Sequence, residues 1–363
     1  MAYNQMLQST IEGVKAITRT DLCLMNTEGE VIASTFQDAE KYREAALKFA
    51  VSPAEIQVVQ GYQYFKISDG NTLEYVMLIR GDGDDIYTIG KLVAFQIQGL
   101  LSAYKEKHDK ENFIKNVLLD NMLLVDIYNK ARKLRIDTDA RRCVLVVETS
   151  RVRDNTAMDI LKGLLAGRSR DFITAVNEET IIVVRDLGKN DDYKEIHHLS
   201  VEIIDILNTE AMANARVAYG TIVGNIKDIS RSFKEAQMAL DVGRIFYEER
   251  SIVAYSRLGI GRLIYQLPVS LCKMFIEEIF PDTTPEEMDE ETLLSIRKFF
   301  ENSLNVSETA RQLYIHRNTL VYRLDKVNKA TGLDLRVFED AITFEIALMV
   351  VKYMRFLEEK GDY

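Results

Sequence analysis

The segment 305–329, with the sequence NVSETARQLYIHRNTLVYRLDKVNK, constrains the fold more than any other part of the chain. It holds two short patterns of helical spacing, which are interrupted at residues 313–315. The first pattern opens at Ser307 and the second runs from His316 to Val327, and each gathers its apolar residues on one face. Two short amphipathic helices joined by a tight turn are the layout of a helix-turn-helix.

The outer face of the second pattern carries side chains that suit DNA recognition. An arginine can donate two hydrogen bonds to guanine, an asparagine can pair with adenine, and hydroxyl groups can hold phosphates. In the expected docking, the start of this helix enters the major groove. The candidate DNA contacts are Ser307, Thr309, His316, Arg317, Asn318, Thr319, Tyr322 and Arg323.

These candidates divide by the part of the DNA that each would meet. We expect Arg317, Asn318 and Arg323 to contact bases. Ser307 and Thr309 are expected at backbone phosphates, and the others at phosphates or base edges. Arg323 has a second interpretation, because its position on the helix can turn its side chain toward the protein.

The charge distribution favours a small DNA-reading module on an acidic body. Residues 305–330 hold five Lys or Arg against two acids, whereas residues 286–304 are net acidic. The whole chain has a formal net charge of −10, which argues against a non-specific polyanion binder and against a membrane-surface protein. The alternative is structural, because many helical hairpins bind no nucleic acid and some contact protein instead.

Length and cysteine content limit the number of domains and the classes of protein that fit this chain. The 363 residues suggest two or three domains. Cys23, Cys143 and Cys272 lie far apart without CxxC spacing, which indicates neither a disulfide framework nor a zinc site and fits a reducing cytosol. The N-terminus shows no signal-peptide pattern and no stretch is apolar enough to span a membrane. We therefore expect a cytoplasmic protein without a membrane partner.

Residues 1–90 predict a small PAS-like sensor domain with one antiparallel sheet under helical cover. The order is helix, hairpin, helix, hairpin, and such a layout encloses a ligand pocket more often than an active site. Residues 91–138 have helical spacing with a charged middle, and we interpret them as connecting signalling helices. The strand candidates of the first domain are Leu22–Met25, Val31–Ser34, Gln63–Ser68 and Tyr75–Arg80.

Residues 139–257 predict a ferredoxin-like sandwich with an extra strand, in the order β-α-β-β-α-β-α-β. Residues 258–289 are interpreted as a linker region with a short helix at Ser270–Ile279, in which 284–287 (TPEE) is typical of a helix capping box. Residues 290–363 would be an all-α reader domain. The expected fold class is therefore α+β and multidomain.

The run IHRNTLVYRL at 315–324, continued by TGLD at 331–334, closely resembles the C-terminal helix-turn-helix of the PucR/CdaR family of bacterial regulators. The middle domain resembles the degenerate GGDEF-like domain of these regulators, since Phe233–Ala236 and Gly243 resemble its late helix. The resemblance implies a ligand-responsive transcription factor that controls uptake or catabolism of a small metabolite. Its partners would be a double-stranded DNA operator, a small-molecule effector and a second copy of the chain, as a homodimer or higher oligomer.

The resemblance also implies an N-terminal pocket for carboxylated sugars in the sugar-diacid regulators. At 39–46 this chain has AEKYREAA, without the glycine of that pattern and with Arg43 near the expected histidine. The sensor would therefore recognise a different molecule. Arg43, Lys66 and Arg80 are candidate partners for an effector carboxylate, and the alternative for each is a solvated surface charge.

The competing class is an enzyme, a nucleotide cyclase-like signalling protein. The hairpin that carries Gly-Gly-Asp-Glu-Phe in active cyclases has VNEET at 176–180 here, so the glycines that admit a nucleotide are absent. Glu178 and Glu179 are carboxylates of the type that Mg²⁺ prefers, but a turn of this kind is more often solvated. We expect no enzyme activity, no cofactor and no metal.

Overall fold

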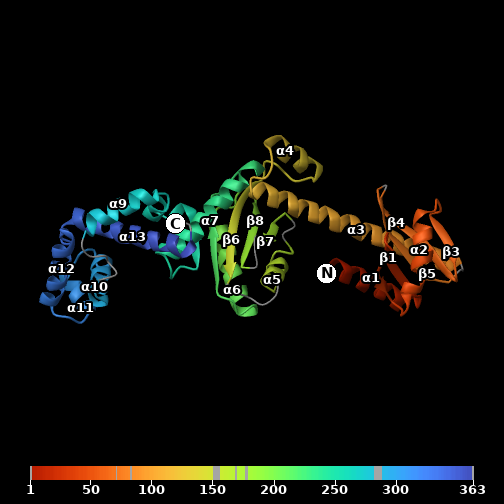
Figure 1. The fold of residues 1–363 in the computed structure, drawn as a ribbon, viewed down its shortest axis with the longest axis horizontal. Helices are drawn as coiled ribbons and strands as arrows, with labels where there is room; N and C mark the ends of the chain where they lie inside the picture. The colour runs from red at the N-terminus through yellow and green to blue at the C-terminus, as the bar shows by residue number, and fades with distance from the viewer. Residues whose placement is uncertain are drawn as a thin grey trace. The chain divides into compact units, whose positions relative to one another are not determined.

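The computed structural model describes residues 2–70, 72–81, 84–149, 156–167, 170–175, 179–281 and 288–361. The chain divides into two compact units, unit 1 over 1–113 and unit 2 over 114–363 (Figure 1). The long helix α3 (Asp84–Leu118) crosses the division, and α4 (Leu124–Lys133) follows it. No helix within the described ranges has the length and apolar character to cross a membrane.

Unit 1 is built on a five-stranded antiparallel sheet in the order β2-β1-β5-β4-β3. Helix α1 precedes the sheet, and the 3-10 helix η1 and helix α2 are inserted between its second and third strands. The elements are α1 (Ala2–Thr18), β1 (Leu22–Asn26), β2 (Val31–Ser34), η1 (Ala39–Tyr42), α2 (Arg43–Val51), β3 (Ile56–Val59), β4 (Tyr62–Asp69) and β5 (Thr72–Arg80).

Both faces of this sheet are covered, because successive side chains of a strand point to opposite faces. Leu22 and Leu24 pack in one apolar cluster with residues of α1 and α3. Cys23 and Met25 pack in the other cluster with Phe49 of α2. The four strands predicted in this domain are present, and the short strand β3, which was not predicted, is only partly buried.

The sheet of unit 2 has the order β10-β9-β6-β8-β7, in which β10 runs parallel to β9 and the other neighbours are antiparallel. The predicted alternation of strands and helices is confirmed, although residues 176–178 of the predicted hairpin lie outside the described residues. The elements are β6 (Arg141–Thr149), α5 (Thr156–Leu164), β7 (Phe172–Ala175), β8 (Thr180–Leu187), α6 (Tyr193–Glu210), β9 (Ala215–Tyr219), α7 (Ile229–Phe246) and β10 (Ile252–Ala254).

The continuous apolar run at 143–147 in β6 is buried because helices cover both faces of this sheet. Leu145 and Val147 pack with α5 and α6 in one cluster. Helix α7 lies against β6 and β9. The approach is close at Gly220, where an added Cβ atom would lie 2.0 Å from the carbonyl oxygen of Ser232.

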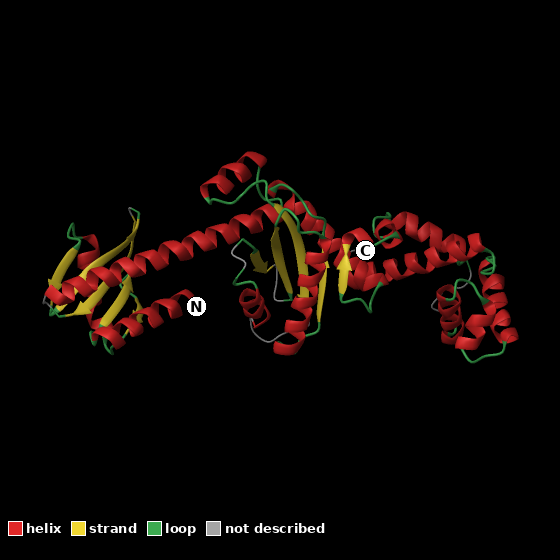
Figure 2. Ribbon diagram, turned by 180° about the vertical axis from the view of Figure 1, so that it is seen from behind, coloured by secondary structure: helices red, strands yellow, loops and turns green. Residues whose placement is uncertain are grey.

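The C-terminal part of unit 2 is all helical (Figure 2). Residues 258–281, which the sequence assigns to a linker, contain α8 and α9, and Ile264 and Cys272 pack against Val350 and Met354 of α13. The expected capping box at 284–287 lies outside the described residues. The elements are α8 (Ile260–Ile264), α9 (Val269–Ile279), α10 (Glu290–Glu301), α11 (Val306–Gln312), α12 (Arg317–Thr331) and α13 (Phe338–Lys360).

Candidate nucleic-acid interface

Side-chain caps set the ends of the two helices of the helix-turn-helix. Asn305 caps α11, since its Oδ1 accepts a hydrogen bond from the Glu308 amide at 3.1 Å. The expectation that Ser307 opens this helix is therefore wrong, because Asn305 supplies the cap two residues earlier. His316 caps α12 through its Nδ1, which accepts from the Asn318 amide at 3.2 Å. Gly332, in the left-handed region at φ 76°, ends α12.

The turn between the helices is closed by backbone hydrogen bonds. The Ile315 amide donates to the Ala310 carbonyl oxygen at 3.0 Å. This closure places Tyr314 at φ 54°, and its side chain is 96% exposed. The sequence marked Tyr314 only as part of the break between two helices. Its exposure beside the start of α12 adds an aromatic side chain to the candidate surface.

An apolar core holds α11 and α12 in a single arrangement. Leu320, Leu324 and Val327 of α12 are buried together with Ala310 of α11. The same cluster includes Ile296 and Phe299 of α10 and Phe344 and Ala347 of α13. The second pattern thus has the apolar inner face that its spacing predicted, and its polar face is left outside.

That outer face presents most of the predicted DNA contacts to solvent. His316, Arg317, Asn318, Thr319 and Tyr322 are all exposed. Within the described part of the chain, no acidic side chain pairs with Arg317 and no hydrogen bond engages the Asn318 amide group. Both side chains therefore keep their full donor capacity for a ligand. Ser307 is also exposed, in the first turn of α11.

Thr309 does not belong to this surface. It is completely buried, and its hydroxyl donates to the Asn305 carbonyl oxygen at 2.8 Å. A buried hydroxyl that is already satisfied inside the protein cannot reach a phosphate. The predicted DNA contact is wrong, because packing of α11 against the core turns position 309 inward.

Arg323 also faces the protein. Its guanidinium pairs with Glu291 of α10 and donates to the Ser295 hydroxyl at 2.9 Å. The side chain is only 17% exposed. The expectation of a base contact is therefore wrong, and the second interpretation of this residue, that it turns toward the protein, describes the structure.

Lys326 occupies a position on α12 that the sequence reasoning did not select. It lies one helical turn after Tyr322, and its Nζ pairs with Asp289 at 2.7 Å. Asp289 caps α10 as well, accepting from the Thr292 amide at 2.8 Å. The Lys326 ammonium, followed by the Thr292 amide, lowers the pKa of this carboxyl below its usual range. The four-residue spacing of Lys326 from Tyr322 places both residues on one side of the helix, and this is the sequence signal that could have identified it.

Comparison with known proteins gives two family models that match different parts of the chain. The model described as the PucR C-terminal helix-turn-helix domain matches residues 292–350, and the model described as a GGDEF-like domain matches residues 121–242. Two named relatives match as well. The chain is therefore similar to transcriptional regulators of the PucR/CdaR type, and its C-terminal helices match the PucR helix-turn-helix. Residues 292–350 are the part that holds the exposed face of α12.

The two relatives differ in how much of each protein is matched. The purine catabolism regulatory protein of Bacillus subtilis (strain 168) is 28% identical over 163 residues, which is 44% of this chain. The chain covers only 31% of that relative's length. The carbohydrate diacid regulator of Escherichia coli (strain K12) is 26% identical over 298 residues, which is 76% of each chain.

A solved structure, the regulator of polyketide synthase expression from Bifidobacterium adolescentis, is also similar. It is 15% identical and matches 69% of this chain and 99% of its own. The TM-score is 0.33, which is too low for the likeness to support an inference.

The effector candidates that the PucR/CdaR resemblance suggested in unit 1 each have a separate partner. The Arg43 guanidinium donates to the Glu28 carbonyl oxygen at 3.2 Å. The Lys66 ammonium donates to the Ser52 carbonyl oxygen. Arg80 pairs with Asp21 at 3.4 Å, where Lys15 and then Arg80 lower the carboxyl pKa. The structure does not show the three cations converging on one carboxylate site.

Proposed function

We propose that this protein, which is similar to PucR/CdaR-type regulators, is a ligand-responsive, sequence-specific DNA-binding regulator of transcription. The proposal rests on one observation: the polar side chains at the start of α12 are exposed, while apolar side chains of the same helix fix it in the core. Arg317 and Asn318 are exposed and unpaired within the described residues, while Leu320 and Leu324 anchor the same helix in the core. A guanidinium and an amide held in this way can read guanine and adenine in a major groove.

The proposed DNA surface consists of Ser307, Tyr314, His316, Arg317, Asn318, Thr319 and Tyr322. Arg317 and Asn318 would contact bases, and the others phosphates or base edges. Lys326 adds positive charge on the same helix, and a phosphate would compete with Asp289 for its ammonium. Each phosphate contact adds to the salt dependence of binding.

The proposed organisation follows the order sensor, relay, reader. Residues 1–90 would form a PAS-like sensor, which the five-stranded antiparallel sheet supports. Residues 91–138 would be the connecting helices and residues 139–257 the GGDEF-like relay. Residues 258–289 would join the relay to a reader at 290–363. The effector would be a small metabolite whose uptake or catabolism the target genes serve.

Genomic footprinting of the protein, followed by binding measurements on the recovered operator, tests this proposal. Arg317→Ala and Asn318→Ala should each weaken operator binding by about 1–3 kcal/mol and relax base preference at one position. Lys298→Ala is the matched control, because Lys298 is a cation of α10 that pairs with Glu301 of the same helix and has no part in the proposed DNA surface. If both alanine variants bind the operator like the parent protein, α12 is not the reading helix.

The enzyme alternative has a direct test of its own. Incubation of the protein with GTP and Mg²⁺ should yield no cyclic dinucleotide. Formation of the product would contradict the proposal.

A further inference from the structure

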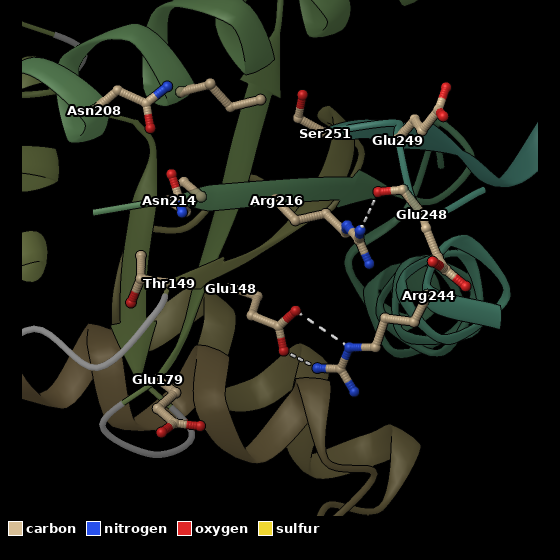
Figure 3. A pocket seen from close by; sticks show the side chains of 12 residues that line it. Glu148, Thr149, Glu179, Asn208, Asn214, Arg216, Arg244, Glu248, Glu249 and Ser251 are labelled. Atoms are coloured by element: carbon tan, nitrogen blue, oxygen red, sulfur yellow. Dashed lines mark hydrogen bonds and ion pairs between the residues drawn. The ribbon is translucent and has the colours of Figure 1, made fainter. Parts of the chain in front are cut away.

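A cleft of about 640 Å³ lies in the GGDEF-like domain at one end of its sheet (Figure 3). Glu148 and Thr149 enter it from the end of β6, and Arg216 enters from β9. Asn208 comes from the last turn of α6 and Arg244 from the last turn of α7. The volume falls in the range of small-molecule sites, which is roughly 300–1,000 Å³.

Several hydrogen-bonding groups in the cleft have no partner among the described residues. One Arg216 nitrogen donates to the Glu248 carbonyl oxygen at 2.8 Å, and no carboxylate of the described residues pairs with this guanidinium. Likewise, the amide groups of Asn208 and Asn214 have no hydrogen bond to any described residue. The Arg244 guanidinium, in contrast, is held by Glu148. Arg216 is therefore the arginine of this lining that has no carboxylate partner among the described residues.

The charge of the lining restricts the ligand class. The two arginines face four carboxylates, which belong to Glu148, Glu179, Glu248 and Glu249. An excess of negative charge disfavours a ligand that is only anionic, such as a nucleoside triphosphate. A ligand with one carboxylate and one ammonium matches the lining better, because it can occupy Arg216 without adding net negative charge.

A chain of polar contacts leads from this cleft to the reader domain. Arg244, which pairs with Glu148, also lies 3.5 Å from a carboxylate oxygen of Asp241. The other oxygen of Asp241 accepts from the Tyr265 hydroxyl at 2.7 Å and from the Lys360 ammonium at 3.0 Å. Lys360 is the last residue of α13, whose earlier turns form the core under the helix-turn-helix.

We propose that the cleft binds a small zwitterion of the α-amino acid type, with its carboxylate on Arg216 and its ammonium on Glu148. An ammonium on Glu148 loosens the hold of that residue on Arg244. Arg244 then pairs more strongly with Asp241, which changes the contact of Asp241 with the end of α13. The binding step is independent of the proposed DNA function, whereas a regulatory role of the second step rests on it.

Titration calorimetry on the full chain tests the binding step. The ligands are the twenty common L-amino acids, each used alone, with succinate, putrescine and Mg²⁺–GTP as comparators. We expect at least one amino acid to bind, and Arg216→Gln to raise its Kd about tenfold or more, as loss of a charged hydrogen bond does. Binding of none of the amino acids, or binding of Mg²⁺–GTP in their place, overturns the proposal.

Arg141→Gln is the matched control for this measurement. Arg141 lies at the opposite end of β6 and likewise donates to backbone carbonyl oxygens, those of Gly188 at 2.8 Å and Lys189 at 2.9 Å. Its replacement should leave the Kd unchanged. An equal loss in both variants would show a general effect on the domain and would also overturn the assignment of Arg216.

Hydrogen exchange without DNA tests the second step. Saturation with the bound amino acid should change the amide protection of residues 350–361 in the parent chain. In Asp241→Asn the amino acid should still bind, but this change in protection should be lost. Unchanged protection in the parent chain would refute the connection to α13. Because no DNA is present, that outcome is separate from a failure of the proposed DNA function.

Discussion

Gly220 occupies a position at which no other side chain fits. The Ser232 carbonyl oxygen lies 2.0 Å from the position that a Cβ atom would take, and the Gly220 amide donates to the Val144 carbonyl oxygen at 3.1 Å. Neither neighbour is a flexible side-chain end that can move aside. The absence of a side chain at residue 220 therefore lets α7 lie directly on the sheet.

Gly220→Ala should lower the free energy of unfolding by about 1–3 kcal/mol, the usual cost of forcing extra volume into a packed interior. Chemical denaturation of the full chain measures it. Gly224→Ala is the control, since a Cβ atom added at Gly224 would have no neighbouring atom within 4 Å. Equal stability of the two variants would show that the contact of α7 with the sheet is looser than the structure indicates.

Arg323 is a cation of α12 that contacts the protein's own helix α10 and not a ligand. Arg323→Met keeps the aliphatic stem but removes the hydrogen bond to Ser295. We expect a loss of about 1–2 kcal/mol in stability. The base preference of operator binding, measured by selection from random duplexes, should stay that of the parent protein. A changed base preference would show that Arg323 contacts a base.

At the element scale, α10 and α12 are joined near the start of α10. Asp289 caps α10 through one carboxylate oxygen and pairs with Lys326 through the other. The lowered pKa of Asp289 makes this junction dependent on pH. Its contribution to stability is complete above the ordinary aspartate pKa of 3.8, and it is lost as the pH falls toward the lower pKa of the folded state.

Lys326→Met should raise the pKa of Asp289, because the largest cause of the lowered value is removed. Nuclear magnetic resonance titration of the Asp289 carboxyl measures this change. Asp289→Asn keeps the cap without the charge, so its stability should fall less steeply than that of the parent chain below pH 4. A pKa that does not move in Lys326→Met would mean that the ion pair is not formed in solution.

At the scale of the whole molecule, the proposed DNA function needs more contact surface than one helix-turn-helix supplies. A single module of this kind buries little area, and helix-turn-helix proteins usually bind as pairs at two half-sites. We therefore infer that two copies bind one operator. The half-sites should form an approximate palindrome with centres about 34 Å apart, or a multiple of that distance.

Footprinting at single-base resolution and analytical ultracentrifugation of the complex measure these properties. A duplex with one half-site should bind far more weakly than the full operator. Stoichiometric binding of one chain to an asymmetric site would contradict the inference.

Local patterns were sufficient for most elements of this chain. The helices of the helix-turn-helix follow from spacing within 305–329. Most strands follow from short runs on either side of a turn, as at 26–29 and 69–71, or from the apolar run at 143–147. Strand β3 was missed because it is short and only partly buried, so its residues show no alternation of apolar and polar types. The periodicity of apolar residues in a sequence predicts a buried element only where that element has a distinct apolar side.

Only the tertiary structure shows which of the predicted site residues are accessible to a ligand. Thr309 and Arg323 have the side chains of DNA contacts, but α10 and the core draw both of them inward. Arg80 meets Asp21, a residue 59 positions earlier in the chain. The sequence by itself determined that a helix with a polar, basic face follows a tight turn near residue 315. Only the tertiary structure decided which of those polar groups remain free, because long-range ion pairs and packing have no local signature.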